Sequence, residues 1–213
     1  MPDEDSALTA PSHQVLTSPC GVTAEVLHHG ALRRLDAFGL SLLLQPATVA
    51  EAGLTNVHLR VHRPDGIARR PLLGPGSGST VRLGDRGAVV EGTHADVDYR
   101  LALRLGSEHA TWHWLLEVTN TSATPVTVDA VLTHDPALAP MGAVRTNEYY
   151  VSQYLDLSPV QTADQGIAVA VRQNMPGERA PWLMVGALGR GVSWATDALQ
   201  LVERTAEGVV WSG

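Results

Sequence analysis

The stretch that decides the fold is residues 97–132, VDYRLALRLGSEHATWHWLLEVTNTSATPVTVDAVL. Apolar residues occupy every second position from Val97 to Leu105, and the same period of two returns from Trp112 to Val118 and from Val126 to Leu132. This period places alternate side chains on opposite faces of a strand. The Asn, Ser and Pro residues at 120–125 are typical of a turn. The stretch therefore predicts an antiparallel meander of three strands with one buried face.

Short alternating segments with turn residues between them continue along the rest of the chain. Further strands are expected at 22–27, 32–38, 40–45, 55–62, 81–83, 88–93, 149–155, 167–173, 182–188, 192–195 and 199–203. Within the central stretch, the side chains expected in the core are Tyr99, Leu101, Leu103, Trp112, Trp114, Leu116 and Val128. Many short strands without an intervening helical pattern favour an all-β protein, built as an antiparallel β-sandwich.

Length and charge restrict the class of protein. The 213 residues suit one large domain that builds its core without a disulfide or metal. The net charge of −7 argues against binding to nucleic acid, and no segment approaches the ~20 apolar residues of a membrane span. Residues 1–14 are polar and acidic, unlike a secretory signal, and predict a disordered leader. We therefore expect one cytoplasmic domain over residues 15–213.

The histidines do not form a recognisable metal motif. His58 and His62 share the polar face of an expected strand, and His94, Asp96 and Asp98 do the same on another. Solvated outward faces explain both groups. The single cysteine excludes an internal disulfide and a zinc site with several thiolates. We expect neither a metal nor another cofactor.

The densest chemistry lies in NEYYVSQY at 147–154, which holds three of the four tyrosines beside amide, carboxylate and hydroxyl groups. Aromatic rings pack against the C–H faces of sugars, and amides and carboxylates bind their hydroxyls. The alternative is a plain strand at a sheet edge, with Tyr149, Val151 and Gln153 inward and Tyr150, Ser152 and Tyr154 outward. The predicted saccharide or interdomain contact residues are Asn147, Glu148, Tyr149, Tyr150, Gln153, Tyr154, Arg172, Asn174 and Trp182.

Several motifs in the same order resemble a known family. NEYYVSQY is followed by RQNM at 172–175 and PWLM at 181–184, and preceded by TNVHLR at 55–60 and PLLGP at 71–75. Together they are similar to the N-terminal region of the 1,2-β-oligoglucan phosphorylases, in the cellobiose phosphorylase group of glycoside hydrolase family 94. The resemblance runs from about Gly30 to Glu203.

This resemblance implies an N-terminal β-sandwich of the galactose-mutarotase-like (supersandwich) type, followed in the family by linker helices and an (α/α)6 barrel. The complete enzymes use phosphate to cleave β-1,2-glucosidic bonds with inversion and release glucose 1-phosphate. This chain has no helical pattern for a barrel, so no catalytic residue is assigned. It is expected to be the non-catalytic N-terminal part of a longer phosphorylase. Its expected partners are a β-linked glucooligosaccharide and the missing barrel or a second subunit.

Two other functions remain open. One is a stand-alone carbohydrate-binding module. The other is an aldose-epimerase-like enzyme, which needs a general acid and a general base across the sugar ring. His113 and Glu117 are its candidates, although both also fit the outward face of a strand.

Overall fold

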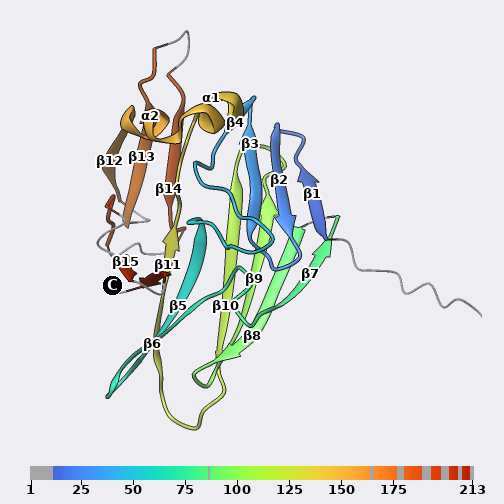
Figure 1. Ribbon diagram of the computed structural model, residues 1–213. Helices are drawn as coiled ribbons and strands as arrows, with labels where there is room; N and C mark the ends of the chain where they lie inside the picture. Colours follow the sequence, from blue (N-terminus) through green and yellow to red (C-terminus); the bar gives the residue numbers. More distant parts are fainter. Residues whose placement is uncertain are drawn as a thin grey trace, which may run out of the picture. The chain divides into compact units, whose positions relative to one another are not determined.

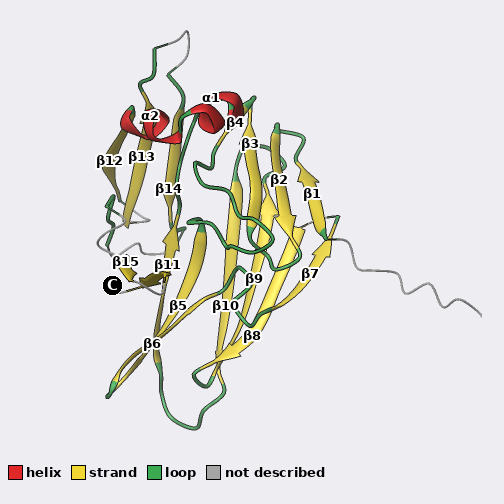
Figure 2. Cartoon of the chain, in the orientation of Figure 1, coloured by secondary structure: helices red, strands yellow, loops and turns green. Residues whose placement is uncertain are grey.

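A computed structural model describes residues 12–85, 87–163, 166–176, 180–188, 193–197, 202–205 and 208–211. Antiparallel strands dominate these residues, with only two helices of six residues each (Figure 2). The prediction of an all-β antiparallel fold is confirmed. None of the helices that the structure describes is long and apolar enough to cross a membrane. The chain divides into two compact units, Met1–Glu148 and Tyr149–Gly213, which are described separately.

The first sheet of the Met1–Glu148 unit has the order β1-β2-β3-β4. Its strands are β1 (His13–Thr17), β2 (Val22–Leu27), β3 (Leu32–Ala37) and β4 (Leu40–Ser41). In β2 the apolar residues Val22, Ala24 and Val26 are fully buried, as the period of two requires. β4 is shorter than the expected strand at 40–45. β1 begins inside the expected leader, of which residues 1–11 lie outside the described residues.

The second sheet has the order β10-β9-β8-β7 (Figure 1). Its strands are β7 (Thr80–Gly84), β8 (Gly87–His94), β9 (Val97–Leu105) and β10 (Trp112–Asn120). β9 and β10 pair antiparallel from Trp112 opposite Leu105 to Asn120 opposite Val97. The first two strands of the predicted meander are therefore confirmed.

The third strand of the meander was predicted in the wrong sheet. β11 (Thr127–Thr133) pairs with β5 (Asn56–Arg63), which in turn pairs with β6 (Gly66–Pro71). Residues 121–126 form a longer connection than the two residues of a tight hairpin. A cross-strand ion pair supports the pairing of β11 with β5. Asp129 of β11 lies opposite Arg60 of β5, and their side chains are 2.6 Å apart.

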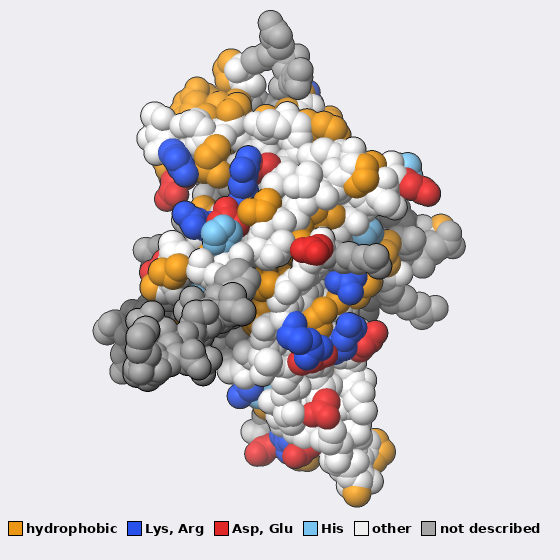
Figure 3. Space-filling view, turned by 90° about the vertical axis from the view of Figure 1, so that its right-hand side faces the viewer, with side chains coloured by type: hydrophobic (Ala, Val, Ile, Leu, Met, Phe, Trp, Pro, Cys, Tyr) orange, Lys and Arg blue, Asp and Glu red, His pale blue; other side chains and the backbone are white. Residues whose placement is uncertain are grey.

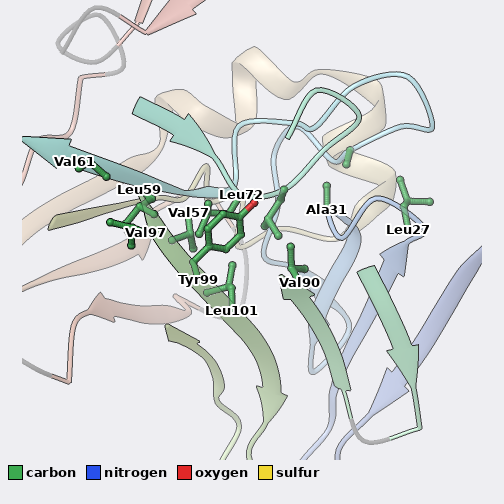
Figure 4. Packing of buried hydrophobic residues seen from close by; sticks show 12 residues of the cluster. Leu27, Ala31, Val57, Leu59, Val61, Leu72, Val90, Val97, Tyr99 and Leu101 are labelled. Carbon is green, nitrogen blue, oxygen red and sulfur yellow. The ribbon is translucent and has the colours of Figure 1, made fainter. Parts of the chain in front are cut away.

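A hydrophobic cluster of this unit joins buried residues of β5 to those of β8 and β9, and it also takes in Leu27 of β2 and the loop residues Ala31 and Ala47 (Figure 4). The ring of Tyr99 is buried in it, and the Tyr99 hydroxyl lies 2.8 Å from Ser79 Oγ, which donates to the Leu72 carbonyl. Gly92 faces Tyr99 across the strands, and a Cβ there would lie 2.5 Å from the Tyr99 hydroxyl. A glycine is thus required to accommodate this ring.

Edge strands explain where the predicted core was wrong. Tyr99, Leu101 and Leu103 are buried, as expected for the inner strand β9. The residues Trp112, Trp114 and Leu116 of β10 are only half-buried. Val128 of β11 is 37% exposed, although its cross-strand neighbour Val61 is fully buried. β10 and β11 are the edge strands of their sheets, so their apolar faces receive less cover.

The Tyr149–Gly213 unit contains a sheet of order β12-β13-β14 and the pair β15-β16. Its strands are β12 (Leu155–Thr162), β13 (Gly166–Gln173), β14 (Trp182–Gly186), β15 (Val202–Thr205) and β16 (Gly208–Trp211). β13 and β14 were predicted, although β14 ends two residues before the predicted Leu188, and β12 was not predicted. Of the strand expected at 192–195, residues 193–195 are not a strand and 192 lies outside the described residues. Residues 199–201 also lie outside, and β15 begins at Val202.

Two short helices lie at the junction of the units in sequence. α1 spans Met141–Thr146 and α2 spans Glu148–Gln153. The organisation of residues 15–213 as one domain stays a prediction.

Candidate functional site

The tyrosine-rich segment is a helix, and the strand predicted at 149–155 is wrong. α2 covers Glu148–Gln153, and its Ser152 hydroxyl donates to the Tyr149 carbonyl at 2.9 Å. Val151 is the one buried residue of this helix, with 1% of its surface exposed. A strand would bury every second side chain of this segment. In the helix only Val151 is buried, and Tyr149, Tyr150 and Gln153 are exposed. Glu148 in the first turn complements the helix dipole and helps to begin the helix.

The helix brings Tyr150 and Tyr154 together. Residues four apart lie on one side of a helical turn, and here the two ring centroids are 4.9 Å apart. A hydrogen bond with the Tyr154 hydroxyl raises the pKa of Tyr150 above its ordinary value. Tyr149 and Tyr150 are 71% and 41% exposed.

The following strands hold α2 in place. The Gln173 side chain donates from Nε2 to the Val151 carbonyl at 3.1 Å and accepts a hydrogen bond from the Met175 amide at 3.1 Å. The Asn174 amide donates to the Tyr154 carbonyl at 2.9 Å. Asn174 therefore contributes its backbone to the anchoring of the tyrosine segment.

A second aromatic surface lies on the β12-β13-β14 sheet. Asp156, Arg172 and Trp182 occupy one cross-strand row, with Asp156 opposite Arg172 and Arg172 opposite Trp182. The Arg172 guanidinium lies 5.5 Å from the centre of the Trp182 ring, within the range of a cation–π contact. Trp182 is 62% exposed, and Met184 on the same face of β14 is 56% exposed.

The structure divides the nine predicted residues into separate groups. Gln173 bonds to α2, and because successive side chains of a strand alternate, its neighbour Arg172 points to the opposite face of the sheet. Asn147 caps α1, its amide donating to the Ala143 carbonyl at 3.1 Å, and belongs to the Met1–Glu148 unit with Glu148. Gln153, the last residue of α2, is exposed. Sequence reasoning missed Asp156 and Met184, which only the register of β12 and β14 places beside Arg172 and Trp182.

The epimerase candidates do not form an acid–base pair. His113 and Glu117 lie on one strand four residues apart, which is about 13 Å along β10. His113 lies 3.2 Å from the Thr111 hydroxyl, and Glu117 pairs with Arg100 at 3.4 Å. A sugar ring cannot contact both groups at that separation.

Surface charges of the Met1–Glu148 unit pair with one another (Figure 3). Arg82 and Arg100 both bind Glu91, at 2.6 and 3.2 Å, and Arg33 binds Glu25 at 3.3 Å. Opposite signs are interspersed, so the face shown in Figure 3 offers no uniformly basic patch to a nucleic acid. Within the described residues, no group of three or more His, Cys, Asp or Glu side chains is arranged to hold a metal ion.

His58, His134 and Asp135 are buried titratable groups of this unit that are not among the nine predicted contact residues. Burial lowers the pKa of His58 to about 4 and that of His134 to about 4. Burial raises the pKa of Asp135 to about 6, against an opposing hydrogen bond from the Gln45 backbone and with a further rise from the nearby charge of Glu148. The Thr55 hydroxyl connects the two neighbours, lying 3.3 Å from His134 Nδ1 and accepting from the Asp135 amide at 3.3 Å.

The fold defines an all-β domain with exposed aromatic residues, and sequence comparison gives its family. A family model described as the SOGP N-terminal domain matches residues 25–209, and the chain belongs to this family. The chain is also 33% identical over 152 residues to a 1,2-beta-oligoglucan phosphorylase of Listeria innocua serovar 6a. That match covers 71% of this chain and 13% of the relative, so the chain spans a small part of the relative's length.

Proposed function

We propose that the chain is the non-catalytic N-terminal domain of a cytoplasmic phosphorylase that converts β-1,2-glucooligosaccharides and phosphate to glucose 1-phosphate. The observation that carries this proposal is the family match over residues 25–209, which a phosphorylase relative supports at 33% identity. The all-β architecture is compatible with the galactose-mutarotase-like sandwich of glycoside hydrolase family 94. In this proposal the (α/α)6 barrel supplies the catalytic acid, and this chain needs no cofactor.

The proposed contribution of this domain is contact with saccharide and with protein. The exposed rings of Tyr149, Tyr150 and Trp182 supply aromatic surface, and the nearby amide, carboxylate and guanidinium groups bind hydroxyls or a facing protein. The protein side of this contact is the barrel or a second subunit. A free-standing carbohydrate-binding module would use the same aromatic groups, without a barrel.

The absence of catalysis in this chain is the first testable consequence. We expect the purified chain to release no glucose 1-phosphate from β-1,2-glucotriose and phosphate. Phosphorolysis needs a carboxylic acid that protonates the leaving oxygen, and in this proposal the barrel supplies that acid. The assay couples glucose 1-phosphate to a spectrophotometric readout, with the Listeria relative as the positive control. A polarimetric assay with α-glucose, in which we expect only the spontaneous rate, tests the epimerase alternative. Activity in either assay that co-purifies with the chain would contradict the proposal.

A further inference from the structure

We propose that the exposed face of β13 and β14 is the saccharide-binding surface, on which one glucosyl unit of a β-linked glucooligosaccharide stacks on Trp182. This inference rests on the proposed function and deepens it. It separates the nine contact residues into a sugar surface on the sheet and a tyrosine surface on α2 that is left to protein contact.

The indole of Trp182 is presented as a platform. Its ring is 62% exposed although it stands on a regular strand, and the Arg172 guanidinium lies 5.5 Å from the ring centre. The cation occupies one face of the ring, which leaves the other face for a ligand. A β-glucosyl ring has axial hydrogens on both faces, so it offers the flat apolar surface that stacks on an indole. Because Arg172 holds the ring, little side-chain freedom is lost on binding.

Polar groups for the sugar hydroxyls stand beside the ring. The Arg172 Nε is buried and has no hydrogen-bond partner within the described residues. No ion pair joins Arg172 to Asp156 in this part of the chain, although the two lie opposite each other in the sheet. The exposed carboxylate of Asp156 is therefore available to accept hydrogen bonds from hydroxyl groups, whereas the buried Nε of Arg172 is not, and Arg172 contributes through its contact with the ring.

The dimensions suit a short oligosaccharide. Neighbouring strands are about 4.8 Å apart, so the row from Asp156 through Arg172 to Trp182 spans about 10 Å, close to the length of a disaccharide. Further along this face, Ser158, Ala170, Ala168 and Gly186 are small, whereas Met184 and Val160 in the same rows are larger and apolar. Beside Trp182, the face therefore combines small side chains with the exposed Met184.

These features favour a saccharide over a docked protein. Trp182 and Met184 are the large exposed apolar side chains of β14, and small or charged residues surround them. The core of a stable protein interface is larger and is depleted in charged residues. The tyrosines of α2 differ, because Tyr150 and Tyr154 already bind each other through their hydroxyls, which reduces their capacity for sugar hydroxyls.

The test is an NMR titration of the full chain with β-1,2-glucotriose. The chain has five tryptophans, and the indole N–H signal that disappears in Trp182→Ala assigns Trp182. We expect this signal to move most in the native chain, with a dissociation constant in the range of about 1 mM. Trp182→Ala should weaken binding at least about tenfold, and Arg172→Met about fivefold. Phe38→Ala is the matched control, since this aromatic residue is 68% exposed, is not one of the nine contact residues and should leave the affinity unchanged.

The outcomes separate this inference from the function on which it rests. If Tyr149→Ala and Tyr150→Ala abolish binding while Trp182→Ala preserves it, the sugar surface lies on α2 and the inference is wrong, although the proposed function stands. If the native chain does not bind the trisaccharide, the saccharide contact of the proposed function fails as well. If Trp182→Ala changes only self-association, measured by light scattering on the same samples, a second copy of the chain occupies this face and the inference is wrong.

Discussion

Acidification from about pH 7.5 to about pH 3.5 should lower the free energy of unfolding of the Met1–Glu148 unit by about 3 kcal/mol. The cause is the burial of His58 and His134, which lowers the pKa of each from 6.5 to about 4. Between these two pH values the unfolded chain takes up protons that the folded chain excludes. One pKa unit corresponds to about 1.4 kcal/mol, so each histidine lowers the free energy of unfolding by about 3 kcal/mol below its folded pKa. The net loss is about 3 kcal/mol because Asp135 offsets one of the two histidines.

Asp135 acts in the opposite direction. Its buried carboxyl has a pKa of about 6 in place of 3.8, so the folded chain binds this proton more tightly than the unfolded chain. The stabilisation is fully present below about pH 3.8 and is lost as the pH rises through about 6. It amounts to about 3 kcal/mol and offsets one of the two histidines at low pH.

The measurement is urea-induced unfolding of the native chain and of Asp135→Asn across this pH range. The variant should be more stable than the native chain by up to about 3 kcal/mol at pH 7.5, because it removes a buried charge, and equal to it near pH 3.5. Its acid destabilisation should therefore be steeper than that of the native chain. A difference between the two proteins that does not change with pH would show that Asp135 has an ordinary pKa.

Leu101→Ala should destabilise the same unit by about 3–4 kcal/mol. Leu101 is fully buried in the cluster that joins β5 to β8 and β9, near Tyr99 and opposite Val90 (Figure 4). Truncation loses the transfer free energy of the side chain and leaves a cavity that rigid neighbouring strands cannot fill.

The matched control is Leu115→Ala on β10, where the same side chain is 48% exposed. Its truncation should cost less than about 1 kcal/mol, since most of the side chain already contacts water. Denaturant unfolding followed by tryptophan fluorescence measures both variants. Equal losses would contradict the assignment of Leu101 to the core of this unit.

Local alternation predicted individual strands well and their partners poorly. The bounds of β2 and β9 agree with the pattern, because each strand has one buried apolar face. The pairing of β11 with β5 depends on contacts between distant residues, such as Arg60 with Asp129, which alternation does not reveal. For the same reason, the exposure of Val128 could not be predicted, since it depends on the position of β11 at a sheet edge.

The segments around the candidate site were the hardest to predict. Tyrosine and valine favour strands, yet α2 forms where Gln173 binds the Val151 carbonyl from a later strand. The strand β12 was missed because it contains Asp156, Ser158 and Pro159, and proline is tolerated only at edge strands and similar positions. The sequence therefore supplied Trp182 and Arg172 as candidates, whereas Asp156 required the register of the sheet.

The most direct test of the proposed function is a calorimetric titration of the purified chain with a linear β-1,2-glucooligosaccharide. We predict saturable binding with a dissociation constant of about 1 mM, because a few exposed sugar contacts compete with water. An α-1,4-linked oligosaccharide of the same length serves as the linkage control and should bind more weakly. Equal binding of both linkages, or no binding of the β-1,2-linked sugar at about 20 mM, would contradict a role in β-1,2-glucan recognition.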